Sequence, residues 1–211
     1  EPTPSSTVTP TTTTTYYAAV QACDFYKDDI EAYLAGNLIA QSSPNWATWS
    51  GSGGGQDDAF ISNSQAFSGS NSIYFNYLND DDLYLPFDQT YNSGDVEIVL
   101  YMYVVSKAHM NLQNDLPVNS PEILDLIFTN NGMLEINIDG TLLIGTYPGI
   151  NQWFELKITG NLTSSIWGVY VNGGYQGGTV AGNGNSIASV NFKPEIGDEY
   201  YIDDVEWYVI S

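Results

Sequence analysis

Short hydrophobic runs, many of them alternating with polar residues, follow one another from Asp24 to the end of the chain and are separated by turn residues. The clearest alternation lies in residues 95–105 (DVEIVLYMYVV), where Val96, Ile98, Leu100 and Met102 share one face of an extended chain. A period of two residues is typical of a strand that buries one side. The pattern predicts further strands within residues 58–78, 81–87, 122–130, 132–139, 141–147, 152–160, 165–180 and 200–210.

Turn residues connect several of these predicted strands as hairpins. They are Asn130–Gly132, Asp139–Gly140 and Asn172–Gly174. Apart from one turn near DDIEAYLAG, no segment has a helical pattern. The chain is therefore predicted to be all-β, an antiparallel β-sandwich of jelly-roll type over residues 23–211, preceded by an extended N-terminal arm at residues 1–22.

The composition supports this fold and excludes two classes of partner. Aromatic residues make up 14% of the chain, and glycine is frequent, as in turn-rich β domains. Four lysines and no arginine stand against 25 acidic residues, which gives a net charge of −21. Without a basic surface, we expect binding neither to nucleic acid nor to anionic membranes. No apolar run is long enough for a membrane-spanning helix.

The chain holds one cysteine and one histidine. Cys23 cannot form an internal disulfide, and we expect a buried free thiol. His109 is expected in a loop or at the surface. A zinc site or a nucleophilic triad would need more such ligands and partners than the chain has.

Four segments resemble known secreted sandwich modules. QWFELKITGNLTSSIWGVYVNGGYQGG is similar to the paired strands of concanavalin A-like and laminin G-like domains. SQAFSGSNSIYF and YYIDDVEW resemble segments of secreted bacterial jelly-roll modules, including carbohydrate-binding ones. DDIEAYLAGNLIAQSSPNWATWSG resembles the opening of such modules in exported proteins of Bacteroidetes-type bacteria. The resemblance covers residues 24–211 and implies a secreted, extracellular or cell-surface protein. The start of the chain at Glu1, without methionine, favours the same location.

Enzymes that share this fold often carry a Glu-x-Asp-x-Glu strand, and the segment to compare is LEINIDG. It places Glu135, Asn137 and Asp139 on one face, so two of the three positions depart from the pattern. Positions i and i+4 of a straight strand lie about 13 Å apart, whereas glycosidase carboxylates lie about 5 to 9.5 Å apart. We therefore expect no catalytic activity.

The resemblance also implies a structural calcium ion where the first and last strands are neighbours. Carboxylates are the ligands that Ca²⁺ prefers. The candidate ligands are Asp28, Asp29, Asp203 and Asp204, with Asp57 and Asp58 as additions. The alternative is that these are solvated acids at strand edges.

Exposed aromatic rings indicate a carbohydrate site. Trp46 and Trp49 border a loop in SPNWATWSG, and Tyr101 and Tyr103 alternate against the apolar face of their strand. We predict that these four rings stack on sugars. Ordinary packing is the competing interpretation.

The N-terminal arm has a composition of its own. Eight of the first fifteen residues are threonine, and no charge occurs between Glu1 and Asp24. Such composition is typical of an O-glycosylated linker, with Thr9, Thr11, Thr12, Thr13, Thr14 and Thr15 as candidate glycosylation sites. It also suits a strand that pairs with another sheet, because uncharged β-branched segments add readily to sheet edges. The residues expected to carry this pairing are Val8, Thr13, Tyr16, Tyr17 and Val20.

Two functions follow from these observations. The first is a non-catalytic, exported structural subunit that forms a head-to-tail filament with other copies of itself through the arm. The alternative is a carbohydrate-binding or adhesion module that carries a glycosylated stalk.

Overall fold

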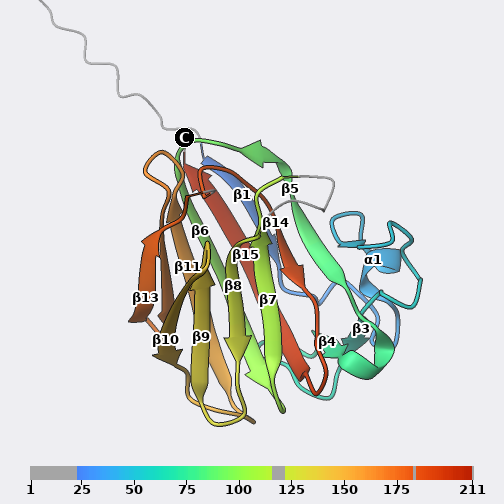
Figure 1. The fold of residues 1–211 in the computed structure, drawn as a ribbon. Helices are drawn as coiled ribbons and strands as arrows, with labels where there is room; N and C mark the ends of the chain where they lie inside the picture. The colour runs from blue at the N-terminus through green and yellow to red at the C-terminus, as the bar shows by residue number, and fades with distance from the viewer. Residues whose placement is uncertain (1–22, 116–121, 183, 211) are drawn as a thin grey trace, which may run out of the picture.

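Two antiparallel sheets face each other in the computed structural model, which describes residues 23–115, 122–182 and 184–210 (Figure 1). Within these residues helix is limited to one short turn, α1 (Ile39–Ser42), and one 3-10 turn, η1 (Tyr77–Asn79). The predicted antiparallel β-sandwich of jelly-roll type is confirmed.

Sheet A contains both the first and the last strand. Its order is β13 (Gly174–Val180), β12 (Ile166–Val171), β11 (Trp153–Asn161), β6 (Asp95–Val104), β15 (Glu199–Ile210), β4 (Ser72–Asn76) and β3 (Phe60–Ser62), and β1 (Cys23–Asp28) also pairs with β15.

Sheet B lies in front of sheet A in Figure 1. Its order is β10 (Thr141–Thr146), β9 (Met133–Ile138), β8 (Glu122–Phe128), β7 (Ala108–Gln113), β14 (Ile187–Phe192), β5 (Leu83–Tyr91) and β2 (Ala47–Thr48).

The predicted alternation places the core between the sheets. Val96, Ile98, Leu100 and Met102 of β6 are buried, and the residues between them face outward. Aromatic rings join the two layers. Phe75 and Tyr200 of sheet A stack with ring centroids 4.9 Å apart, and the Phe75 ring lies 5.4 Å from that of Phe192 of sheet B. Functional residues are therefore expected on the outer faces, where the centre of sheet B is itself buried at β7 and β14.

Two predicted hairpin turns have the backbone that their sequences require. Asp139 and Gly140 join β9 to β10 with φ angles of 47° and 81°. Asn172 and Gly173 join β12 to β13 with φ angles of 48° and 75°. Both pairs of positive φ angles fit the type I′ turn that matches strand twist.

Two expectations about single residues are wrong. Cys23 is exposed, because it is the first residue of β1 at the end of the sheet. His109 is buried on the central strand β7, where Asp125 of β8 binds its ring. A residue's position in an isolated run does not reveal which neighbouring strand covers it.

Candidate functional site: the outer faces of the two sheets

Five aromatic residues form one line across the outer face of sheet A. The strand register pairs Trp153 with Tyr103, Tyr103 with Tyr201, Tyr201 with Tyr74, and Tyr74 with Phe60. We call these five residues the aromatic row. Neighbouring strands are about 4.8 Å apart, so the row extends over about 19 Å.

The rings of the aromatic row contact one another without being closed off. The centroids of Tyr103 and Trp153 lie 5.5 Å apart, and those of Tyr74 and Tyr201 lie 4.8 Å apart. Phe60 is 40% exposed, and Tyr74, Tyr103 and Trp153 are half-buried, whereas Tyr201 at the centre of the row is buried at 9%. Ring edges and faces of the other four members remain open to a ligand.

Polar groups accompany the aromatic row. The Tyr74 hydroxyl donates to Glu199 Oε1 at 2.9 Å and accepts from the side-chain amide of Asn76 at 2.8 Å. Burial raises the pKa of Tyr74 to about 12, so this hydroxyl keeps its proton at neutral pH. The surface combines apolar ring faces with hydrogen-bonding groups.

A second pair of rings borders the row. Phe67 stacks on Tyr101 with centroids 3.5 Å apart, and it is 43% exposed. Its loop is held by the buried Asp203, whose carboxylate accepts from the Phe67 and Ser68 backbone N–H groups at 2.8 and 3.2 Å. Burial raises the pKa of Asp203 to about 6.

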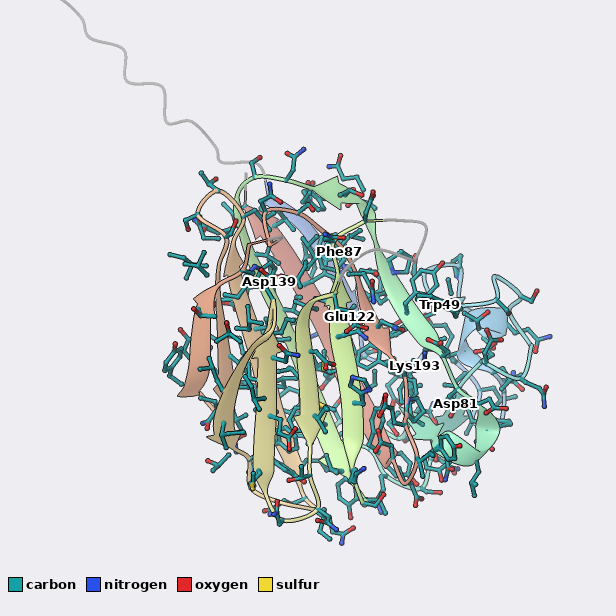
Figure 2. The ribbon with its side chains drawn as sticks, viewed as in Figure 1. Trp49, Asp81, Phe87, Glu122, Asp139 and Lys193 are labelled. Carbon is teal, nitrogen blue, oxygen red and sulfur yellow. The ribbon has the colours of Figure 1, made fainter. Side chains whose placement is uncertain are left out.

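The predicted sugar-binding residues separate into different parts of the molecule. Tyr103 belongs to the aromatic row and Tyr101 lies beside it. Trp49 lies at the far edge of sheet B and is 40% exposed (Figure 2). Trp46 does not fit the prediction, because its ring is 3% exposed, packs on Phe192 and donates to Asp28 at 3.1 Å.

Sequence reasoning missed four members of the row, which are Phe60, Tyr74, Tyr201 and Trp153. Tyr74 lies between the core residues Ile73 and Phe75, so alternation places it on the outer face. That signal assigns a face, but only the pairing of β4, β15 and β6 puts these rings in one line.

The outer face of sheet B is polar. Register across five of its strands joins the residues of a second line, the polar row, which are Tyr84, Asn191, Asn111, Asp125 and Asn137. The Asn111 amide donates to Glu122 at 3.2 Å and accepts from Gln113 at 2.7 Å. Asn191 Oδ1 and Ser189 Oγ are buried and have no hydrogen-bond partner.

A hollow of about 200 Å³ opens at one end of the polar row. Its lining residues are Glu122, Asp125, Asn137, Asp139 and Gly140, and Glu122 and Asp139 are labelled in Figure 2. Burial, together with the Asp125 carboxylate, raises the pKa of Glu122. Burial by itself lowers the pKa of the His109 imidazole, but the hydrogen bond to Asp125 and the charges of Asp125, Glu195 and Asp198 together raise it. The hollow is acidic, so it suits a ligand that donates hydrogen bonds better than it suits an anion.

The candidate calcium ligands are not gathered at one point. The first and last strands are neighbours as predicted, with Asp28 opposite Val205. Asp28 faces the core and accepts from Tyr26, Tyr33 and Trp46, whereas Asp203 faces the loop on the outer side of the same sheet.

The other candidate ligands also have partners within the protein. Asp29 accepts from the Glu31 N–H, and Asp204 accepts from the Ser68 hydroxyl. Asp57 holds Ser50, and Asp58 binds three backbone N–H groups, those of Ala40, Gln41 and Gly54. Over the described ranges, no three His, Cys, Asp or Glu side chains are grouped as a metal ion requires. Calcium stays a prediction.

The residues compared with a catalytic strand do not form one row of carboxylates. Glu135 and Asn137 are on the outer face of β9, but Asp139 is in the turn, where it accepts from the Gly182 N–H at 2.8 Å. The chain's one thiol is on sheet A and its one imidazole is on sheet B. The thiol and the imidazole therefore do not form a nucleophile–base pair.

The predicted glycosylation sites and arm residues fall within positions 1–22, outside the described residues. The search for a helix long and apolar enough to cross a membrane, made over the described part of the chain, found none.

Comparison with known proteins identifies the fold. No protein-family model matches the chain, and no curated protein is similar to it in sequence. Among solved structures, a sialidase is similar with a TM-score of 0.58 and 14% identity over 87% of this chain. A Trypanosoma rangeli sialidase bound to a difluoro sugar acid follows with a TM-score of 0.51 and 13% identity over 72% of this chain.

The match covers only part of each sialidase, since it spans 18% and 27% of their lengths. A Caenorhabditis elegans galectin, of which 89% is covered, has a TM-score of 0.43 and 18% identity over 61% of this chain. Identities this low show the fold alone. The comparisons therefore show a β-sandwich fold and no more.

Proposed function

We propose that this protein is a non-catalytic carbohydrate-binding module that holds a neutral glycan chain along the aromatic row. The observation that carries the proposal is the alignment of five aromatic side chains across five neighbouring strands. Sugar rings have apolar faces that pack on aromatic rings and hydroxyls that hydrogen-bond at the rim. A row of about 19 Å offers contacts to several successive sugar units.

Charge determines which glycans fit. Carboxylate and sulfate groups are bound best by arginine, and this chain has none. Glu155 and Glu199 border the aromatic row, and their charge opposes anionic sugars. The proposed ligand is therefore an uncharged polysaccharide.

The proposal assigns no catalytic role to the aromatic row. The row offers aromatic rings and hydrogen-bonded phenols, and none of its members is a carboxylate acid or base. Export to the cell surface, which the threonine-rich arm supports, would bring such a module to polysaccharides.

An affinity gel that contains neutral polysaccharides tests this function. We expect Trp153→Ala and Tyr103→Ala each to weaken binding up to about tenfold, because one aromatic contact contributes about 0.5 to 1.5 kcal/mol. Tyr175→Ala is the matched control, since Tyr175 is an exposed ring on the same sheet outside the row.

Two results would overturn the proposal. One is the absence of binding to every neutral glycan on an array. The other is binding that survives both row substitutions but is lost in Asn137→Ala, which would move the site to the polar row of sheet B.

A second candidate function is assembly of copies through residues 1–22. The observation that favours it is an open cleft at the edge of the sandwich beside β1, the strand into which these residues lead. Sugar binding and assembly use different surfaces and are compatible in one protein.

A further inference from the structure

One edge of the sandwich is open between β1 of sheet A and β5 of sheet B. A cleft of about 320 Å³ lies there, which we call the edge cleft. Its lining residues are Asp24, Phe25, Tyr26, Pro44, Asn45, Pro86, Phe87, Asp88 and Trp207. The Tyr91 hydroxyl lies 2.8 Å from an Asp24 carboxylate oxygen and 2.6 Å from an Asp88 carboxylate oxygen, close enough to donate its one proton to either, and these contacts close one part of the cleft.

Both strands that border the edge cleft have an unpaired side. Within the described residues, β1 pairs with β15 alone. β5 pairs with β14 on one side, while β2 covers only Leu83 and Tyr84 on the other. Pro86 has no N–H to donate, which is typical of an edge position. Unpaired main-chain groups on both walls can accept an additional strand.

The floor of the edge cleft contains an unused hydrogen-bond donor. The Trp207 ring stacks on Phe87 with centroids 4.4 Å apart and on Tyr26 at 6.2 Å. Its side chain is 4% exposed, yet Nε1 has no hydrogen-bond partner. Leaving a buried donor unpaired is unfavourable. Nε1 lies beneath the surface of the cleft, so an occupant reaches it only if the side chains around it shift.

We propose that the edge cleft receives residues 8–20 of a second copy of this chain as an added strand. This inference rests on the second candidate function and names its acceptor site. The segment VTPTTTTTYYAAV carries no charge, so it approaches the rim carboxylates of Asp24 and Asp88 without repulsion. Its threonine and tyrosine hydroxyls can donate hydrogen bonds to those carboxylates.

The length of the arm suits this contact. An extended segment of 13 residues covers about 43 Å, whereas the six residues of β1 cover about 20 Å. The arm therefore leaves residues to cross from one copy to the next.

The arm of the same chain fits the edge cleft less well. β1 begins at Cys23, so residues 8–20 would have to reverse direction within Gln21 and Ala22 to lie beside it. Tight hairpin turns favour glycine, asparagine or aspartate, and residues 18–22 contain none of these. A donor strand that enters the next copy gives a head-to-tail contact, and repeating that contact gives an open filament.

Disulfide trapping between full-length copies tests the acceptor site. In a Cys23→Ser background, one protein carries Thr13→Cys in the arm and another carries Asn45→Cys at the exposed rim of the cleft. Under mild oxidation we expect the mixture to form a mixed disulfide dimer well above what either protein forms alone. Thr141→Cys, an exposed position at the opposite edge of sheet B, replaces Asn45→Cys as the control and should not form it.

Light scattering on the same samples distinguishes whether copies assemble at all from whether the edge cleft is the acceptor site. Assembly without the Asn45 cross-link would refute the edge cleft as acceptor while the second candidate function stands. Absence of assembly at high concentration would refute both. A cross-link that forms only within one chain carrying both substitutions would show that the arm fills its own cleft and would overturn the inference. Sugar binding at the aromatic row is measured independently of these results.

Discussion

Two buried aspartates, Asp81 and Asp203, and the partly buried Asp82 show how single residues adapt this acidic chain to its fold. Burial raises the pKa of Asp81 to about 7, and that of Asp82 and of Asp203 to about 6. Asp81 Oδ2 accepts from the Asn76 N–H at 2.8 Å, and Oδ1 has no partner. The native state therefore binds protons that the unfolded chain releases, since the ordinary aspartate pKa is 3.8.

The sign of the resulting pH dependence follows from linkage. A carboxyl group with a raised native pKa stabilises the fold most below its unfolded pKa and loses that contribution as pH rises through the native value. We expect the free energy of unfolding to increase between pH 8 and pH 5. Asp81→Asn should raise the free energy of unfolding at pH 8 by at least about 1.4 kcal/mol, the equivalent of one pK unit. It should also make that free energy depend less on pH.

Urea denaturation at pH 5 and pH 8 measures both effects. Asp29→Asn is the control for the loss of one negative charge, because Asp29 is exposed. A loss of stability in Asp81→Asn at pH 8 would contradict the conclusion that the buried, ionised Asp81 carboxylate destabilises the native state.

At the scale of elements, glycines allow β11 and β12 to pack a large ring between them. Gly160 of β11 is paired with Trp167 of β12, and a Cβ at Gly160 would lie 2.5 Å from the indole. The Trp167 ring is 1% exposed, and its Nε1 donates to the Gly184 carbonyl at 3.1 Å. The indole has little room to move.

Gly160→Ala should therefore lower the free energy of unfolding by about 1–3 kcal/mol through overpacking. Thermal unfolding followed by near-ultraviolet circular dichroism measures the change and reports on the Trp167 environment. Thr159→Ala, on the opposite face of the same strand, should have a smaller effect. Equal stability of Gly160→Ala and the parent protein would show that β12 shifts freely.

The whole molecule carries a net charge of −21, so copies repel one another at low ionic strength. If copies assemble through the uncharged arm, screening should accelerate association, because the Debye length falls from about 30 Å at 0.01 M salt to about 8 Å at 0.15 M.

We expect the rate of assembly, followed by light scattering, to rise as sodium chloride increases over this range. A chain that lacks residues 1–20 should show no assembly at either concentration. Assembly that slows with added salt would indicate contacts between opposite charges and would contradict the role of an uncharged arm.

The sequence by itself determined the strands, the hairpins and the acidic character of this protein. Alternation in β6 and the Asp139–Gly140 and Asn172–Gly173 turns depend on neighbours within a few residues, so they can be recognised along the chain. The same local signal placed Tyr101 and Tyr103 on an outer face.

Only the tertiary structure decided which residues meet. The line from Trp153 to Phe60, the burial of Trp46 and His109, and the separation of Asp28 from Asp203 all depend on pairing between distant strands, such as β15 with β4 and β6. A run with period two specifies its faces but carries no information on its partner strand or register. Those are set by packing of the whole sandwich, and they create both the aromatic row and the edge cleft.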